Sequence, residues 1–159
     1  MRIGNGYDIH KLVPERTLYL GGVKVEYPKG LLGHSDGDVL LHAVCDALLG
    51  AAGLGDIGSF FPDNDTRYKN ANSSLFVEKI YALIHEQGLG VVNLDCTIFA
   101  RAPKLGELRD DIRKNLAWLL HVAPTDVNVK FKTMNELGPI GRGDAVAAQA
   151  CVLLETEAT

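Results

Sequence analysis

The chain has 159 residues and a formal net charge of −4, with 47% hydrophobic and 23% charged residues, a composition typical of one soluble globular domain. The acidic balance argues against a nucleic-acid-binding protein, whose surface is basic, but it does not exclude a phosphate ligand held by local charges. No apolar run reaches the ~18 residues of a membrane span, the N-terminus lacks a signal-peptide core, and three widely spaced cysteines indicate reduced thiols.

The segment GYDIHKL, residues 6–12, has the pattern of an extended strand. Side chains alternate faces along a strand, so Asp8 and His10 would point one way and Ile9 the other. Their Cα atoms would lie roughly 6.5–7 Å apart, close enough for both side chains to bind one metal ion. A lone pair of this kind is more often an ordinary polar strand face, so its meaning depends on the rest of the chain.

An apolar helix is predicted after a segment in which Ser35 and Asp38 resemble a capping box, and it ends at Gly53. His42 lies in this helix among Val, Leu, Ala and Cys residues. An imidazole in so apolar a stretch needs hydrogen-bond partners for its nitrogens. One interpretation is therefore a core histidine whose ring is satisfied by Asp46, one helical turn later.

The other interpretation makes His42 a metal ligand. With Asp8 and His10 it would form a set of two imidazoles and one carboxylate, which suits catalytic zinc with an open fourth position. In that case we expect Asp46 or Asp38 to accept the second ring N–H of His42.

The remaining patterns predict a hairpin around Gly21-Gly22, two further helices and three further strands. Apolar residues recur at helical spacing from Ser73 or Ser74 to Gly88 and within 104–120, and they alternate with polar residues within 91–100, 126–133 and 145–155. The sequence thus predicts a single α/β domain over residues 1–159, a sandwich of one mixed β-sheet with three helices packed on one side.

Several polar loop residues are candidates for binding a phosphorylated small molecule. His34 and Ser35 precede the first helix, where backbone N–H groups favour anions, although a plain N-cap turn would explain all but His34. A Gly/Pro loop after Gly55 holds Asp56, Asp63 and Asp65; it is either functional or a series of turns. Basic residues gather at predicted strand ends, which suits a phosphorylated ligand: Arg101, Lys104, Lys130, Lys132 and Arg142.

Taken in order, these segments resemble the family of 2-C-methyl-D-erythritol 2,4-cyclodiphosphate synthases, enzymes of the non-mevalonate isoprenoid pathway. The resemblance covers essentially the whole chain. It is carried by RIGNGYDIH, GLLGHSDGDVLLHAVCDALLGAAGLGDIGSFFPD, RAPKL and LGPIGRGD.

The resemblance implies a phosphorus–oxygen lyase that converts 4-diphosphocytidyl-2-C-methyl-D-erythritol 2-phosphate into the 2,4-cyclodiphosphate and releases CMP. Its zinc ligands would be Asp8, His10 and His42, with one Zn²⁺ in each site. A Mg²⁺ or Mn²⁺ ion is expected with the substrate diphosphate. The protein would act by folding the substrate back and neutralising its charge.

By the same resemblance, His34 and Thr133 would stabilise the transition state. The implied substrate-binding residues are Asp8, His10, His34, Ser35, Asp56, Ile57, Gly58, Phe61, Asp63, Asp65, Ala100, Pro103, Lys104, Leu105, Lys132, Thr133, Asn135 and Arg142.

The resemblance also implies a homotrimer with active sites between subunits. Arg142 would face the threefold axis, where an isoprenoid diphosphate can bind in this family. We expect neither a nucleic-acid nor a membrane partner. The expected location is cytoplasmic, or the plastid stroma if a transit peptide has been removed.

Three positions depart from the family pattern. Asn5 stands where a histidine is common, and Pro139 replaces an aromatic residue near the axis, which weakens the expectation of a ligand there. Asn135 replaces a glutamate that binds the second metal ion. A neutral amide binds a hard cation more weakly than a carboxylate does, so we expect weaker ligation of that ion by the protein.

Two other functions fit the same residues. A zinc phosphohydrolase would use the open metal position to activate water and would give linear phosphates. A non-enzymatic oligomer would use zinc structurally, but this requires a fourth ligand, and the sequence offers no nearby cysteine for it.

Overall fold

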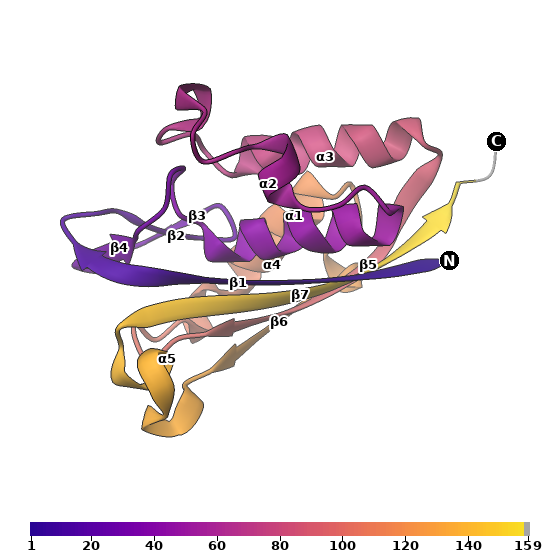
Figure 1. Ribbon diagram of the computed structural model, residues 1–159. Coiled ribbons are helices and arrows are strands. Elements are labelled where there is room, and N and C mark those ends of the chain that lie inside the picture. The colour runs from indigo at the N-terminus through magenta and orange to yellow at the C-terminus, as the bar shows by residue number, and fades with distance from the viewer. Residues whose placement is uncertain (158–159) are drawn as a thin grey trace.

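The computed structural model describes residues 1–157, and its centre is a five-stranded mixed sheet of order β4-β1-β7-β5-β6 (Figure 1). Within it only β5 and β6 pair in parallel. A hairpin of β2 and β3 forms a separate two-stranded sheet. The strands are β1 (Arg2–Pro14), β2 (Leu18–Leu20), β3 (Val23–Val25), β4 (Lys29–Leu31), β5 (Leu89–Phe99), β6 (Val127–Lys132) and β7 (Ala145–Thr156).

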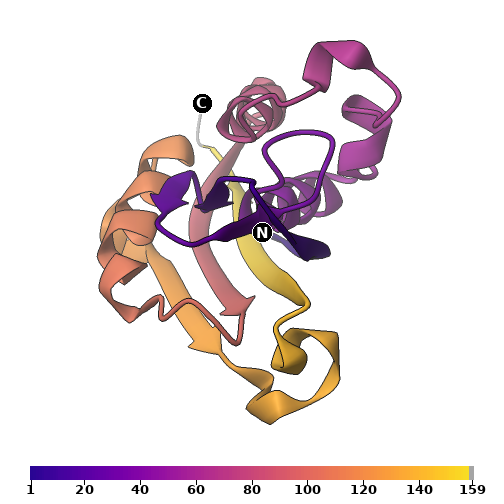
Figure 2. The ribbon, with the colours of Figure 1, turned by 90° about the vertical axis from the view of Figure 1, so that its left-hand side faces the viewer.

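The predicted class, a single α/β domain with a mixed sheet, is confirmed, but the predicted number of helices is wrong. The part of the chain that the structure describes has five α-helices: α1 (Val39–Ala52), α2 (Ile57–Phe60), α3 (Ser74–Glu86), α4 (Arg109–Leu119) and α5 (Gly138–Arg142). The three long helices are the predicted ones. The two additional helices have four and five residues, too few to show a helical period in the sequence. Figures 1 and 2 show α5 at the opposite end of the molecule from α3.

Four short 3₁₀ helices complete the described secondary structure: Thr66–Tyr68, Gly106–Leu108, Pro124–Asp126 and Met134–Glu136. None of the helices within residues 1–157 is both long enough and apolar enough to cross a membrane.

The first long helix, α1, begins differently from the prediction. Its N-cap is Asp38, whose carboxylate accepts the N–H groups of Leu40 and Leu41, so the predicted capping box with Ser35 is wrong. The same carboxylate accepts the N–H groups of Gly21 at 2.9 Å and Gly22 at 2.6 Å. Asp38 is fully buried, and burial raises the pKa of its carboxyl group. These four N–H donors compensate for that burial and join the helix to the β2–β3 hairpin.

Strand β1 lies directly against the backbone of α1. A Cβ atom at Gly6 would lie 1.9 Å from the carbonyl oxygen of Ala43, and one at Gly4 would lie 1.9 Å from that of Ala47. Any larger residue at these positions would push the strand away from the helix, so glycine permits the close approach.

The helices and the sheet enclose one main core. Inward side chains from β1, β5, β6 and β7 meet α1, α3 and α4 there, among them Leu94, Ile98, Val129 and Val152. The opposite face of β1 presents three exposed apolar side chains, Ile3 at 72%, Tyr7 at 55% and Ile9 at 42% of full exposure. Asn5 lies between Ile3 and Tyr7 on this face; exposed apolar side chains gathered on one strand face are typical of a face that packs against another protein surface.

Replacing Gly6 with alanine tests the close approach of strand and helix. We expect Gly6→Ala to lower the free energy of unfolding by about 1–3 kcal/mol, because the new methyl group overlaps a helix carbonyl. Urea denaturation followed by circular dichroism measures the change.

Gly50→Ala is the matched control, because a Cβ atom at Gly50 in α1 meets nothing within 4 Å. This variant should be more stable than the wild type by up to about 1 kcal/mol, since alanine favours a helix more than glycine does. Equal stability of the two variants would contradict the proposed contact.

Candidate metal centre

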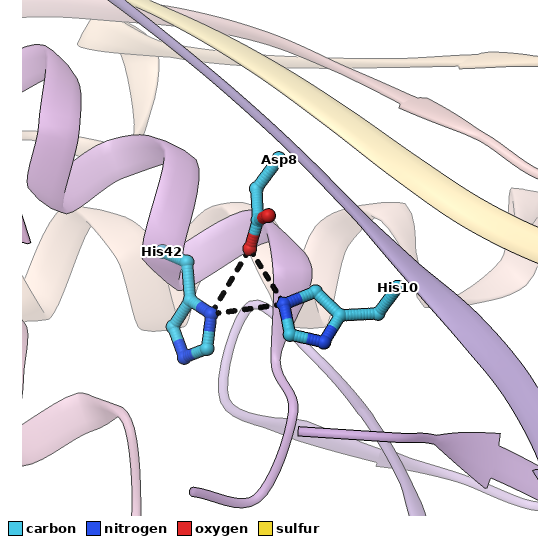
Figure 3. A group of neighbouring side chains, drawn as sticks. All are labelled: Asp8, His10 and His42. Atoms are coloured by element: carbon cyan, nitrogen blue, oxygen red, sulfur yellow. Dashed lines mark hydrogen bonds and ion pairs between the residues drawn. The ribbon is translucent and has the colours of Figure 1, made fainter. Parts of the chain in front are cut away.

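The side chains of Asp8 and His10 from β1 and His42 from α1 converge on one point (Figure 3). Oδ2 of Asp8 lies 2.8 Å from Nε2 of His10 and 3.0 Å from Nδ1 of His42. The two ring nitrogens are 3.3 Å apart. Among the residues that the structure describes, this is the one group of three or more His, Cys, Asp or Glu side chains arranged to hold a metal ion.

These distances fit a small tetrahedral cation. Ligand atoms about 2.0–2.1 Å from a tetrahedral zinc ion lie about 3.3 Å from one another, close to the separations of 2.8, 3.0 and 3.3 Å found here. Two imidazoles and one carboxylate are also the donor types of open, catalytic zinc sites. The geometry thus agrees with the predicted zinc ligands.

The orientation of His10 is fixed by its second ring nitrogen. Nδ1 of His10 lies 2.5 Å from the carbonyl oxygen of Leu32, an acceptor, so this nitrogen carries the proton. When the ring is neutral, Nε2 presents its lone pair to the metal position.

The charges within the group favour an ionised carboxylate. Burial alone would raise the pKa of Asp8, but hydrogen bonds from His10 and His42 outweigh it and hold this pKa well below its ordinary value. For His10 the balance is similar: burial lowers the pKa, whereas the hydrogen bonds to Asp8 and Leu32 raise it, with a net increase above the ordinary 6.5. A metal ion must therefore displace a proton that His10 holds firmly.

The predicted partners of His42 are wrong. Its Nε2 lies 3.0 Å from the hydroxyl oxygens of both Ser35 and Ser73. Asp46 instead accepts the N–H of Ile57 at 2.8 Å, and Asp38 caps α1. The interpretation of His42 as a core histidine satisfied by Asp46 fails for the same reason.

A cavity of about 700 Å³ opens beside the metal group. Of the predicted substrate-binding residues, those that line it are Asp8, His10, His34, Ser35, Ile57, Gly58, Phe61 and Asp63. Asp56 and Asp65 lie in the adjoining loop but not in the cavity wall: Asp56 accepts the N–H of Ser59, and Asp65 pairs with Arg67 at 2.6 Å. The Nε2 atom of His34 lies 2.9 Å from the backbone carbonyl oxygen of Asp65, which joins the two loops.

Aromatic side chains that the sequence prediction missed form part of the wall. Phe76 of α3 stacks on Phe61 with ring centroids 4.3 Å apart, and Tyr68 contacts both rings edge-on. Phe76 also stacks on His42 at 6.3 Å. These rings hold the loop that contains Phe61 against α3 and against the metal group. Phe76 has the spacing of an ordinary core residue of α3, and Tyr68 lies in the loop before that helix, so no local signal marks either as part of a site.

The other predicted residues lie together in a different place. The N–H of Ala100 donates to the carbonyl of Lys132 at 2.9 Å, which joins the ends of β5 and β6, and Arg101 reaches the carbonyl of Arg142 at 3.4 Å. This second group comprises Ala100, Pro103, Lys104, Leu105, Lys132, Thr133, Asn135 and Arg142, none of which lines the cavity. Strand β6 is one edge of the five-stranded sheet, whereas the metal group lies beside β1 and β4 at the other edge.

Asn135 lies in a left-handed turn within the second group. Met134, Asn135 and Glu136 have φ angles of 66°, 48° and 64°. This conformation disfavours most side chains, and asparagine tolerates it better than the others do. The backbone therefore gives a reason for the asparagine at this position.

In comparisons with known proteins, the chain matches one protein family and synthases that share one name. The model of the YgbB family matches residues 1–155. A 2-C-methyl-D-erythritol 2,4-cyclodiphosphate synthase of Enterococcus faecalis is 50% identical over 155 residues, covering 98% of this chain and 99% of that protein. One from Geobacillus kaustophilus is 53% identical over 154 residues, covering 97% of this chain and 98% of that protein.

Solved structures give the same result. IspF of Plasmodium falciparum, in complex with CDP, matches with a TM-score of 0.87 and 38% identity, covering 99% of this chain and 97% of that one. The bifunctional IspDF of Campylobacter jejuni matches with a TM-score of 0.94 and 41% identity, covering 98% of this chain and 42% of the longer protein.

Removal of one ligand tests the metal centre. We expect His42→Ala to weaken zinc binding by more than about 100-fold, because losing a ligand exceeds the 10–100-fold effect of losing a supporting partner. Equilibrium competition with a chromophoric chelator measures the affinity. His85→Ala, the same change at an exposed histidine of α3, should bind zinc as the wild type does; equal binding by both variants would contradict the site.

The raised pKa of His10 predicts how zinc binding depends on pH. Protonated imidazole cannot bind metal, so the affinity should fall by about tenfold per pH unit once the pH is below that pKa. Because this pKa is raised above 6.5, the decline should begin above pH 6.5 as the pH is lowered. Titrations between pH 6 and 8.5 measure it, with circular dichroism as the control for folding. An onset at or below pH 6.5 would show that Asp8 does not stabilise the protonated ring.

Proposed function

The chain belongs to the YgbB family, and on that premise we propose that it is a 2-C-methyl-D-erythritol 2,4-cyclodiphosphate synthase. It would act in isoprenoid synthesis as a phosphorus–oxygen lyase on 4-diphosphocytidyl-2-C-methyl-D-erythritol 2-phosphate. The observation that carries the proposal is the convergence of Asp8, His10 and His42 at a cavity of about 700 Å³ in a chain about half identical to synthases of this name.

The reaction requires positioning and charge neutralisation more than covalent participation of the protein. An oxygen of the 2-phosphate attacks the β-phosphorus of the diphosphate and forms the new P–O bond. The bond from the β-phosphorus to the bridging oxygen breaks, and CMP departs with that oxygen and its electron pair. No water enters and no oxidant is needed, so the products balance the substrate.

Side chains of the metal group and cavity have distinct roles in this proposal. Asp8, His10 and His42 would hold Zn²⁺, which, when bound, neutralises charge on the diphosphate. His34 would donate a hydrogen bond to the charge that develops in the transition state. Its backbone is fixed by the two contacts of Arg16, whose guanidinium donates to the carbonyl oxygens of Gly33 and Ser35.

The loop opposite the metal group would bind the erythritol portion. Ile57, Gly58, Phe61 and Asp63 line the cavity there, and Asp56 fixes the start of α2. The stacked ring of Phe76 limits how far this loop can move away. A substrate chain folded between loop and metal would bring its 2-phosphate toward the diphosphate.

We further propose a homotrimer in which a neighbouring subunit completes each site. Two observations support it. The cavity lies at one edge of the sheet, whereas predicted substrate-binding residues such as Lys104 and Thr133 lie toward the other edge, so a neighbouring subunit would bring the two groups to one substrate. The exposed row Ile3, Tyr7 and Ile9 supplies an apolar face for association. The solved relatives that hold CDP support a cytidine nucleotide as the ligand.

The remaining parts of the proposal concern further ligands and location. A Mg²⁺ or Mn²⁺ ion would accompany the diphosphate, with the amide of Asn135 as a weaker ligand than a carboxylate. Arg142 would bind an isoprenoid diphosphate on the threefold axis; its exposed guanidinium pairs with Asp144 at 3.1 Å. A cytoplasmic location stays a prediction.

The two other functions have less support. A structural metal site needs a fourth protein ligand, and the metal group has three among the described residues. A hydrolase would use the same open position, but the chain's relatives are named as synthases of a cyclic diphosphate.

Product analysis tests the proposed reaction. Purified protein is incubated with 4-diphosphocytidyl-2-C-methyl-D-erythritol 2-phosphate and Zn²⁺, with and without Mg²⁺, and the products are followed by mass spectrometry. We expect CMP and the cyclic diphosphate in equal amounts, and neither with His42→Ala. The rate should increase with Mg²⁺, with half-saturation at a higher Mg²⁺ concentration than in Asn135→Glu, because the carboxylate binds this ion more tightly.

Each rival predicts a different result. Linear phosphates in place of the ring would identify a hydrolase. Stoichiometric zinc with neither product would favour a structural metal and overturn the synthase proposal.

A further inference from the structure

A chain of hydrogen bonds leads from the ring of His42, through Ser73, to the carboxylate of Asp36. Nε2 of His42 lies 3.0 Å from Oγ of Ser73, and that hydroxyl lies 2.5 Å from Oδ1 of Asp36. We propose that Ser73 and Asp36 are positioning residues that hold the His42 ring with its Nδ1 toward the metal. The inference rests on the proposed function, because it requires that Asp8, His10 and His42 bind a metal ion.

The direction of the hydrogen bonds follows from the hydrogens available. A carboxylate only accepts, so Ser73 gives its single hydroxyl hydrogen to Asp36. Ser73 can then only accept from His42, and Nε2 of that ring must carry a proton. In the neutral ring, the proton on Nε2 leaves Nδ1 with a free lone pair, and Nδ1 is the nitrogen that lies 3.0 Å from Oδ2 of Asp8, to which it donates only when the ring carries a second proton. The chain therefore selects the ring form that a metal requires.

Asp36 is held by the backbone and not by the metal. Its Oδ2 accepts the N–H of Ser73 at 2.9 Å, and its Oδ1 accepts the N–H of Asp38 at 3.1 Å. Its own N–H donates to the carbonyl of Ala71 at 2.9 Å. The carboxylate is thus fixed between the loop before α1 and the loop before α3, which gives it a defined position before any ion binds.

Ser73 does not play the usual role of a serine at a helix N-cap. It is the N-cap residue of α3, yet its side chain makes no capping hydrogen bond. Its hydroxyl is instead directed to His42 and Asp36, in a side chain that is fully buried. A serine at an N-cap normally stabilises its helix by about 1 kcal/mol, so its use elsewhere points to a different function.

Ser35 joins this chain, because its Oγ lies 3.2 Å from Oγ of Ser73, but it differs from Ser73 and Asp36 in its position. It also lies 3.0 Å from Nε2 of His42, but it lines the cavity, whereas Ser73 and Asp36 do not. Changes at Ser35 would therefore affect both the ring and a bound ligand. Changes at Ser73 and Asp36 affect the ring of His42 without removing a side chain that lines the cavity.

Zinc affinity, measured without substrate, tests the inference on the full chain. We expect Ser73→Ala and Asp36→Asn each to raise the Kd for Zn²⁺ by about 10- to 100-fold, the usual effect of losing a partner of a ligating histidine. Ser74→Ala is the matched control, because it removes the hydroxyl of the next residue, which does not line the cavity; its Kd should stay within about twofold of the wild type. Thermal unfolding of each variant confirms that it is folded, and Asp36→Asn serves if Ser73→Ala does not fold.

The visible spectrum of the Co²⁺-substituted protein provides a second readout, which a purely structural role would not change. The ligand-field bands should shift in the two variants, because the His42 ring is free to turn, and should be unchanged in Ser74→Ala. A folded Ser73→Ala protein with wild-type Kd and spectrum overturns the inference while leaving the proposed function intact. A wild-type protein that binds no Zn²⁺ removes the metal site itself, and with it both the positioning role and the proposed function.

Discussion

The arrangement of this protein depends on how closely β1 approaches α1. Glycines at positions 4 and 6 leave no Cβ atoms between the strand and the carbonyl oxygens of Ala43 and Ala47. The same face of β1 carries Asp8 and His10 next along the strand, and the helix carries His42 one residue before Ala43. Backbone contact between the two elements therefore sets the distance across which the three side chains of the candidate metal group converge.

Two carboxylates, the buried Asp38 and the partly buried Asp36, add directional contacts to this close packing. Asp38 ties the start of α1 to the β2–β3 hairpin, and Asp36 ties the loop before α1 to the start of α3. Each accepts N–H groups both from its own segment and from one that is distant in sequence. Apolar packing alone is not directional, whereas these hydrogen bonds specify where each loop lies. The wall around the metal group is thus built from polar contacts on one side and from the aromatic stack of Phe61 and Phe76 on the other.

Local patterns in the sequence predict the long elements and point to Asp8, His10 and His42, the three side chains that the structure brings together as a candidate metal group. The alternation in residues 6–12 correctly put Asp8 and His10 on one face of a strand. The partners of His42 were not predictable in this way. Eleven of the fourteen residues of α1 are buried, so its periodicity does not tell which neighbour each face meets. Ser73 is 31 residues from His42, and only the tertiary pairing of two loops brings them together. The cavity beside the metal group is likewise lined by Phe76, whose spacing within α3 is that of any core residue.

The separation of the two residue groups on opposite edges of the sheet has a genetic consequence if neighbouring subunits complete each site. A chain defective in the metal group and a chain defective at Thr133 would each be inactive alone. In a mixed assembly, some interfaces would combine an intact metal group from one chain with an intact β6 edge from the other. Two null alleles could then complement each other, and a single defective subunit would disable no more than the two interfaces that it forms.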